Sequence, residues 1–440
     1  MRAQVLRAWG DALAHETVAT PRPRPGEALV RVEACGVGLT VLNYMNGNQA
    51  RRADWLPRIP GHELVGTVVE LGDGVTTLRV GERVMAYFYL ACGHCDLCRL
   101  AHEPLCRNLK GNVGVAADGG YAEYCALPAF NLLPVPDGVT PVAATAIPDA
   151  IATPFHVSRR AAIAPGDVVM VVGAGGGVGI HMVQMARLFG ARVLGVDVGE
   201  PKLAAAREAG ADAVVDATKG DPAGAVRAAV ADGPTVAVDF VGSRETLALC
   251  LETLGKRGRL VCLTTFPGVT ADVSPRRLVQ DEISVIGSRY CSRWEMARAG
   301  ELVAEGRIRP VVSEVVPLER VGELHAKLRA RTLIGRGRVL SPAPYCKRSS
   351  AASARISTPM GKASSSTSKP GRCQISVIPF SGFAVPRSIR QPGAAAMNRP
   401  KSSENRLRQP VMMLASPTTC CAARSTAPVT DSSLSRAGSA

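Results

Sequence analysis

Four cysteines in one short polar loop are the residues whose types and spacing most clearly predict chemistry. The thiols with the spacing C-x2-C-x2-C-x7-C are Cys92, Cys95, Cys98 and Cys106. Zn²⁺ prefers soft sulfur ligands, and four thiolates close a tetrahedral site that keeps no open position. The pattern therefore predicts a structural zinc that stabilises the loop and performs no chemistry.

Two other interpretations of these cysteines stay open, namely disulfide pairing and four unrelated buried thiols. The chain begins MRAQVLRAWG, without the apolar h-region and cleavage site of a secreted protein. A reducing cytoplasm, where disulfides are rare, is therefore the expected location. His94 and His102 lie in the same loop, and we expect both to be solvated rather than bound to metal.

A glycine-rich segment in the middle of the chain indicates dinucleotide binding. It reads PGDVVMVVGAGGGVGIHMVQMARLFGARVLGVD from Pro165. The apolar run 168–172 predicts a parallel strand buried on both faces, followed by a helix over about 178–189 and a second strand over 192–196. The glycines that permit a tight turn and close approach to a pyrophosphate are Gly173, Gly176 and Gly179.

Asp197 ends the second strand, 18 positions after Gly179. A carboxylate there can accept hydrogen bonds from both hydroxyls of an adenine ribose and would repel a 2′-phosphate. NAD(H) is therefore favoured over NADP(H), which stays the alternative. Lys202 is placed to reach the same ribose.

Further apolar runs alternate with helical stretches and predict a doubly wound parallel sheet in an α/β fold. These runs cover 213–215, 235–240, 259–263 and 283–286. Before residue 145, short strands broken by Gly and Pro predict a β-rich, barrel-like domain. They cover 27–32, 63–71 and 83–87.

The order of these motifs resembles that of the zinc-containing medium-chain dehydrogenase/reductase family, which is alcohol dehydrogenase-like. The resemblance rests on IPGHELVGTVVELGDGVTTLRVGERV from Ile59, on the cysteine loop and on GAGGGVG, and it covers residues 1 to about 340. It implies a GroES-like catalytic domain over 1–145 that 290–340 complete, and a Rossmann coenzyme domain over 146–289. It also places the active site in the cleft between them.

The resemblance further implies a catalytic zinc, although one ligand of the family pattern is missing. His62, Glu63 and Asp149 match the histidine, the adjacent glutamate and the third ligand. The cysteine of the pattern is replaced by Gly38, and Cys35 lies three residues too early. His62 and Asp149, with Glu63 as an additional ligand, are thus a candidate zinc site. The alternative is that His62 is an ordinary core histidine.

The proton relay of the family is matched only in part. Thr40 corresponds to the Ser or Thr whose hydroxyl contacts the substrate oxygen. Val41 replaces the usual Asp, and Asn43 stands about where a relay histidine can occur.

The net charge of +15 is concentrated at the end of the chain. Residues 341–440 hold fourteen Lys and Arg against two Asp and Glu, so twelve of the fifteen charges lie there. This segment is rich in Ser, Ala, Pro and Arg, which predicts a disordered basic tail. It is interpreted as an extension or translation artefact past a natural stop near Pro342, with a nucleic-acid-binding arm as the alternative. No apolar run approaches the roughly 18 residues of a membrane span.

Three hypotheses of function follow. The first is an NAD-dependent alcohol dehydrogenase that interconverts an alcohol and its aldehyde or ketone by hydride transfer. The second is a quinone- or enoyl-type C=C reductase that holds only the structural zinc, and the third is a dinucleotide-binding protein without enzymatic activity. The expected partners are a small alcohol, carbonyl or enone substrate and further copies of the chain in a homodimer or homotetramer. Nucleic acid and membrane are not expected.

Overall fold

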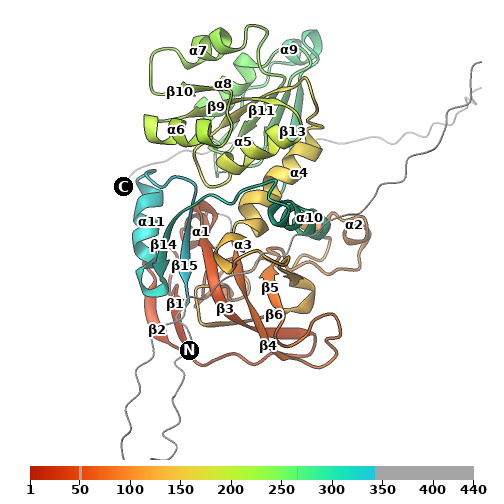
Figure 1. Ribbon diagram of the computed structural model, residues 1–440, viewed down its shortest axis with the longest axis vertical. Coiled ribbons are helices and arrows are strands. Elements are labelled where there is room, and N and C mark those ends of the chain that lie inside the picture. The colour runs from red at the N-terminus through yellow and green to blue at the C-terminus, as the bar shows by residue number, and fades with distance from the viewer. Residues whose placement is uncertain (49–51, 265, 342–440) are drawn as a thin grey trace, which may run out of the picture. The chain divides into compact units, whose positions relative to one another are not determined.

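The computed structural model describes residues 1–48, 52–264 and 266–341, which belong to one compact unit, Met1–Ser350 (Figure 1). Within this unit the chain forms a β-rich lobe and a coenzyme-type lobe. The predicted disordered tail over 341–440 lies, apart from Ser341, outside the described residues. Among the described residues no helix is both long and apolar enough to cross a bilayer.

The second lobe is built on a six-stranded parallel sheet in the order β10-β9-β8-β11-β12-β13. Its strands are β8 (Val168–Val172), β9 (Arg192–Asp197), β10 (Ala213–Asp216), β11 (Val236–Asp239), β12 (Arg259–Cys262) and β13 (Ser284–Gly287). Numbered within the lobe, this is the 3-2-1-4-5-6 order of a doubly wound fold, whose ligand crevice lies at the carboxyl ends of the strands. The predicted strands are confirmed and differ by one residue at some ends.

Helices cover both faces of this sheet. Val169 and Val171 of β8 pack into one apolar cluster, while Met170 and Val172 pack into another. Alternate residues of a strand point to opposite faces, so β8 is buried on both sides, as its continuous apolar run predicts. The helices of this lobe are α5 (Gly179–Leu188), α6 (Glu200–Glu208), α7 (Pro222–Ala229), α8 (Arg244–Thr253) and α9 (Pro275–Gln280).

The β-rich lobe contains a seven-stranded sheet with the path β14-β15-β3-β4-β5-β7, to which β6 adds beside β3. The strands are β3 (Glu27–Val37), β4 (Leu64–Leu71), β5 (Arg83–Ala86), β6 (Tyr124–Pro128), β7 (Leu132–Pro134), β14 (Val312–Pro317) and β15 (Arg336–Leu340). A separate pair joins β1 (Arg2–Val5) to β2 (Ala14–Thr17). Short helical segments of this lobe are α1 (Leu39–Met45), α2 (Asp96–Arg99) and α3 (Pro141–Ala144).

The C-terminal part of the described chain returns to this first sheet. β15 pairs antiparallel with β3, Arg338 lying opposite Gly36, and β14 pairs with β15 in parallel. The prediction ended the β3 strand at residue 32. The strand continues to Val37 because its second half has β15 as a partner more than 290 positions along the chain. α10 (Arg293–Ala304) and α11 (Val321–Arg329) belong to the same returning segment.

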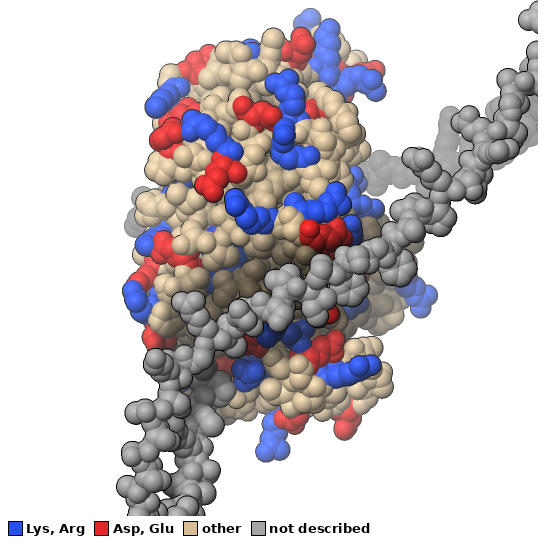
Figure 2. All heavy atoms as spheres, in the orientation of Figure 1, with Lys and Arg blue, Asp and Glu red and all other residues tan. Residues whose placement is uncertain are grey.

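A single π-helical turn, Ile147–Ile151, joins the two lobes and leads into α4 (Ala152–Arg160). All five residues of the turn are buried, Asp149 among them. π-turns are rare and frequently occur at functional sites. On the face shown in Figure 2, acidic and basic side chains of the described residues are interspersed rather than gathered into a patch of one sign.

Candidate active site

The turn between β8 and α5 has the geometry expected of a dinucleotide-binding loop. Gly173 adopts a φ of +83°, which side-chain-bearing residues rarely adopt. A Cβ atom at Gly179 would lie 2.0 Å from the carbonyl oxygen of Gly173, so only glycine permits this close packing of helix on turn. The tight turn predicted from the sequence is confirmed.

Asp197 connects this turn to the end of β9. Its Oδ2 accepts a hydrogen bond from the Gly175 N–H at 2.8 Å, and its Oδ1 accepts one from the Val198 N–H at 2.8 Å. Lys202 Nζ lies 3.6 Å from Oδ1. Each carboxylate oxygen has a second lone pair, so the group retains acceptor capacity for a ligand.

A cavity of about 870 Å³ extends from this turn to the β-rich lobe. It is lined by residues of both lobes, including most of those singled out in the sequence. The predicted site residues that line it are Thr40, Asn43, His62, Asp149, Gly173, Gly176, Gly179, Asp197 and Lys202. Residues far apart in the chain therefore share one space, large enough for a dinucleotide and a small substrate.

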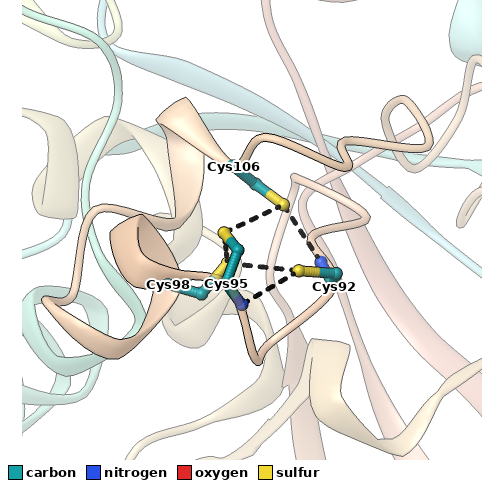
Figure 3. Close-up of side chains that lie close together, drawn as sticks. All are labelled: Cys92, Cys95, Cys98 and Cys106. Carbon is teal, nitrogen blue, oxygen red and sulfur yellow. Dashed lines mark hydrogen bonds between the residues drawn. The ribbon is translucent and has the colours of Figure 1, made fainter.

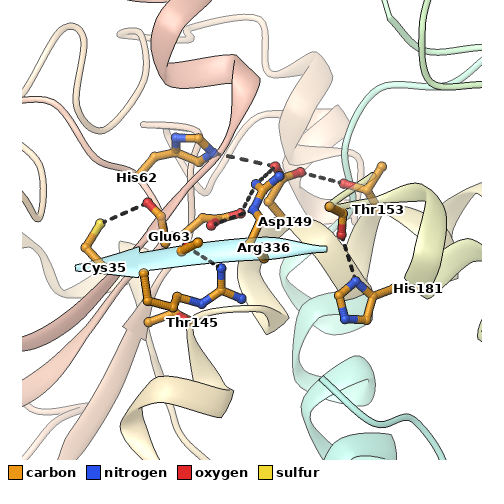
Figure 4. A network of polar contacts seen from close by, with 12 residues as sticks. Cys35, His62, Glu63, Thr145, Asp149, Thr153, His181 and Arg336 are labelled. Atoms are coloured by element: carbon orange, nitrogen blue, oxygen red, sulfur yellow. Dashed lines mark hydrogen bonds and ion pairs between the residues drawn. The ribbon is translucent and has the colours of Figure 1, made fainter. Parts of the chain in front are cut away.

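His62, Glu63 and Asp149 come together beside this cavity, and His62 and Asp149 line it. One ligand atom from each lies within 4.8 Å of the others, and all three residues are buried. His62 Nε2 lies 3.7 Å from Asp149 Oδ2 and has no hydrogen-bond partner among the described residues. Figure 4 shows the three side chains pointing toward one another. Thr153 donates a hydrogen bond to Asp149 Oδ1 at 3.0 Å.

Arg336, which the sequence analysis did not single out, lies between the two carboxylates (Figure 4). Its Nη2 donates to Asp149 Oδ2 at 2.7 Å and also to Glu63 Oε1, while its Nε donates to Glu63 Oε2 at 3.1 Å. The residue is 4 % exposed and lines the cavity. The available sequence signal was a pair of arginines, Arg336 and Arg338, in the segment LIGRGRVL, whose other residues are glycine or apolar.

Two glycines, Gly36 in β3 and Gly38 directly after it, leave space for Arg336 and Glu63. A Cβ atom at Gly36 would lie 1.7 Å from Glu63 Oε2. A Cβ atom at Gly38 would lie 2.5 Å from both Cζ and Nη1 of Arg336. The space that a side chain at position 38 would use is therefore filled by the Arg336 guanidinium.

The electrostatics of the cluster follow from these contacts. Burial alone would raise the pKa of Asp149, but the neighbouring His62 and the charge of Arg336 outweigh it and hold that pKa well below its usual range. Burial would lower the pKa of Arg336, and the carboxylates of Glu63 and Asp149 instead raise it above its usual value. Asp149 and Arg336 therefore form an ionised pair.

This arrangement does not fit a catalytic zinc. The proximity of the three donors and the unpartnered His62 Nε2 favour a metal. However, zinc requires ligand atoms at about 2.0–2.2 Å, and Asp149 Oδ2 already accepts a hydrogen bond from a guanidinium. Position 38, where the family pattern has the remaining cysteine ligand, is a glycine. Cys35 directs its thiol toward the Gly36 carbonyl oxygen at 3.6 Å.

The predicted cysteine ligands do form a cluster (Figure 3). One sulfur from each of the four thiols lies within 4.8 Å of the others. None of the cysteines in the described residues forms a disulfide. The exposed rings of His94 and His102 are not part of the group.

Backbone N–H groups point at these sulfurs. Cys106 Sγ accepts from the N–H of Cys92 and of Asn108, both at 3.3 Å, and Cys92 Sγ accepts from the Cys95 N–H at 3.4 Å. Such donors favour the thiolate, which is the form that binds metal. The donor set and its surroundings thus fit a four-coordinate zinc.

Aromatic side chains form one wall of the cavity. The ring of Phe88 lies 4.5 Å from that of His62 and 4.9 Å from that of Tyr89, and Tyr290 lies 5.6 Å from Phe88. The Arg289 guanidinium stacks over Tyr89 at 4.8 Å and donates to its hydroxyl. This end of the cavity suits an apolar or planar substrate.

Comparisons with known proteins agree with this geometry. Residues 24–137 match the alcohol dehydrogenase GroES-like domain, and residues 177–305 match the zinc-binding dehydrogenase domain. An alcohol dehydrogenase of Geobacillus stearothermophilus is 34 % identical over 342 residues, which are 76 % of this chain and 98 % of that protein. An NAD-dependent alcohol dehydrogenase of Sulfurisphaera tokodaii is 30 % identical over 350 residues, 78 % of this chain and 100 % of that protein. The crystal structure of AibC matches with a TM-score of 0.72 and 34 % identity, covering 78 % of this chain and 96 % of that one.

The fold and the cleft define a two-lobed, dinucleotide-dependent oxidoreductase. The chain belongs to the zinc-containing medium-chain dehydrogenase/reductase family, which is alcohol dehydrogenase-like. This confirms the resemblance and supports zinc and NAD(H) as its cofactors. The hypothesis of a non-enzymatic dinucleotide-binding protein is therefore set aside.

Proposed function

We propose that this protein is an NAD(H)-dependent oxidoreductase that interconverts an alcohol and its aldehyde or ketone. The observation that carries the proposal is the single cavity shared by the glycine-rich turn, Thr40 and the cluster around His62. The balanced reaction takes a carbonyl compound, NADH and one proton to an alcohol and NAD⁺. Bound NADH would supply the hydride from C4 of its nicotinamide.

The residues of the chain have separate tasks in this proposal. The Thr40 hydroxyl hydrogen-bonds the substrate oxygen and transfers the proton, and His62, which lines the same cavity, orients that oxygen. Val41 is buried and cannot replace the acidic relay group. Asn43 lines the cavity and can hydrogen-bond a water that exchanges the proton with the Thr40 hydroxyl.

Asp197 supports a preference for NAD(H) over NADP(H). Its buried carboxylate stands at the end of β9 beside the glycine-rich turn and in the cavity wall. A 2′-phosphate there would meet a negative charge, and Lys202 already lies within 3.6 Å of that carboxylate.

The four cysteines of the loop would hold a structural zinc, and the free thiols of the described chain accord with a reducing cytoplasm.

The activity is tested with the full-length protein and a panel of alcohols with NAD⁺ and carbonyl compounds with NADH, ranging from short aliphatic to aromatic. Absorbance of NADH follows turnover. Oxidation of at least one alcohol and reduction of its carbonyl partner would support the proposal. Absence of both with every member of the panel would refute it.

Reduction of a conjugated C=C bond is the second candidate, favoured by the guanidinium that fills the space beside Gly38. Hydride would add to the β-carbon of an enone or enoyl thioester, the electron pair would move to the carbonyl oxygen, and a proton would then reach the α-carbon. Hydrogen-bond donors can stabilise such an enolate without a metal. NADH-dependent reduction of enones, but not of saturated ketones, would favour this candidate over the first.

A further inference from the structure

We propose that the guanidinium of Arg336 is the resident cation of this active site and excludes a catalytic zinc from it. The inference rests on the proposed oxidoreductase function, and it holds whether the substrate is a carbonyl compound or an enone. It predicts one zinc per chain, in the cysteine loop, and a reaction site that contains none.

The first step of the argument is charge. Glu63 is fully buried and Asp149 is 9 % exposed, so two carboxylates occupy one buried pocket. Buried charges require partners, and removing one member of such a pair is strongly destabilising. Among the described residues, the cation that contacts both carboxylates is Arg336. The chain itself therefore supplies a cation that both carboxylates share and that offsets one of their two charges.

The second step is space. The Arg336 guanidinium contacts an oxygen of each carboxylate, and its Cζ and Nη1 lie 2.5 Å from the position of a Cβ atom on Gly38. A thiolate at position 38 and Arg336 in its present place are therefore mutually exclusive. Glycine at position 38 together with arginine at position 336 therefore takes the place of a cysteine ligand together with its metal.

The third step is what the guanidinium can do. Arginine keeps its charge at any physiological pH and offers five N–H donors in a fixed plane. Nε and Nη2 are used by the carboxylates, whereas Nη1 has no hydrogen bond to the described residues. Arg336 lines the same cavity as Thr40 and His62. Nη1 is thus available to an oxygen that gains negative charge during hydride transfer.

Metal content is the decisive measurement, since it is independent of turnover. Elemental analysis of the full-length protein, expressed with zinc in the medium, is expected to give one zinc per chain. The value should stay at one in His62→Ala and fall to zero in Cys98→Ser. Two zincs in the wild type that fall to one in His62→Ala would overturn the proposal.

A gain-of-metal experiment tests the exclusion directly. Gly38→Cys combined with Arg336→Ala is expected to bind a second metal, and Co²⁺ substitution should add thiolate-to-cobalt absorption that His62→Ala removes. The matched control is Gly38→Cys combined with Arg338→Ala, which deletes the other buried arginine of β15 and retains the Arg336 side chain as a competitor for the carboxylates. A second metal in the control at the same occupancy would contradict the exclusion.

The role of Arg336 in turnover is separated from a purely structural role by kinetics. Arg336→Ala is expected to lower kcat by about 10²- to 10³-fold, the range found for loss of one oxyanion donor. Added guanidinium ion should restore part of that rate. An unchanged kcat with only a raised KM for NADH would reduce Arg336 to a coenzyme contact and refute its action on the substrate. If no substrate turns over in any variant, the proposed function fails, and the metal counts still decide the exclusion.

Discussion

At the scale of single residues, the site depends on side chains whose neighbours lie far away in the sequence. Asp197 was identifiable because its spacing from the glycines follows from one strand and one helix. Arg336 was not, because it contacts Glu63 across 273 positions and Asp149 across 187. A sequence pattern encodes local spacing, whereas this contact exists only after β15 pairs with β3.

Replacing Asp197 with Ala is expected to raise the KM for NADH and to weaken discrimination against NADPH. A hydrogen bond to a charged group contributes about 1.5–3 kcal/mol, so the rise should be roughly 10- to 100-fold. Steady-state kinetics with both coenzymes measure the effect. Asp197→Asn, which still accepts from the Gly175 N–H, separates loss of charge from loosening of the turn.

The matched control is Asp216→Ala, which removes the aspartate at the end of the adjacent strand β10. Asp216 is absent from the residues that line the cavity among those described. Coenzyme preference that is unchanged in Asp197→Ala, or that changes equally in Asp216→Ala, would mean that the ribose contact is misplaced.

At the scale of elements, the coenzyme lobe could be predicted well and the β-rich lobe less so. β8 is a continuous run of apolar, mostly β-branched residues buried on both faces, so its bounds follow from composition alone. β3 extends to Val37 through ACGV, which carries little strand signal by itself. The π-turn at Asp149 had no sequence signal, since a single hydrogen bond of this type, from the Ile151 N–H to the Ala146 carbonyl oxygen, leaves no periodicity in a five-residue segment.

The cysteine loop should depend on its metal. Cys98→Ser is expected to lose the bound zinc, to lower the free energy of unfolding by several kcal/mol and to aggregate, because metal-binding energy is folding energy for such a loop. Elemental analysis and chemical denaturation measure both effects. Cys262→Ser, a partly buried thiol outside the cluster, is the control that should keep its zinc. A fully stable, zinc-free Cys98→Ser protein would contradict a structural role.

His181 should make the contact between α5 and the segment before β14 sensitive to acid. The ring bonds the Gly177 carbonyl oxygen through Nδ1 at 2.8 Å, and its Nε2 accepts from the Val311 N–H at 2.9 Å. These bonds require the neutral ring, and burial lowers the pKa of His181 to about 3. The unfolded chain takes up a proton near pH 6.5 that the folded chain does not, so stability is lost as the pH falls below that value.

Because of this ring, the free energy of unfolding is expected to fall by up to about 1.4 kcal/mol for each pH unit between pH 6 and pH 4. Urea denaturation at several pH values measures it. His181→Gln retains a donor and an acceptor but does not titrate. Its free energy of unfolding should therefore depend less on pH, by the contribution of about one proton. An identical slope in both proteins would show that the folded ring is protonated.

At the scale of the whole molecule, the edge of the coenzyme sheet offers a surface for self-association. β13 is the last strand of the six-stranded sheet, and Val285 on it is 45 % exposed. An unpaired edge presents free N–H and C=O groups that a second copy can complete across a two-fold axis. The homodimer or homotetramer stays a prediction, and this edge is the place where we expect a second copy to pair.

If the predicted dimer forms across this edge, Val285→Lys shifts it from dimer to monomer, because the new charge lies at the junction of two edges and loses its hydration there. Burial of one unpaired charge costs enough to weaken dimerisation by at least about tenfold, or ~1.4 kcal/mol. Light scattering after size exclusion, over a dilution series, measures the change. Val80→Lys carries the same substitution at an exposed valine of the β-rich lobe and should remain dimeric. If both variants dissociate alike, net charge rather than the β13 edge controls assembly, and if neither does, the subunits meet elsewhere.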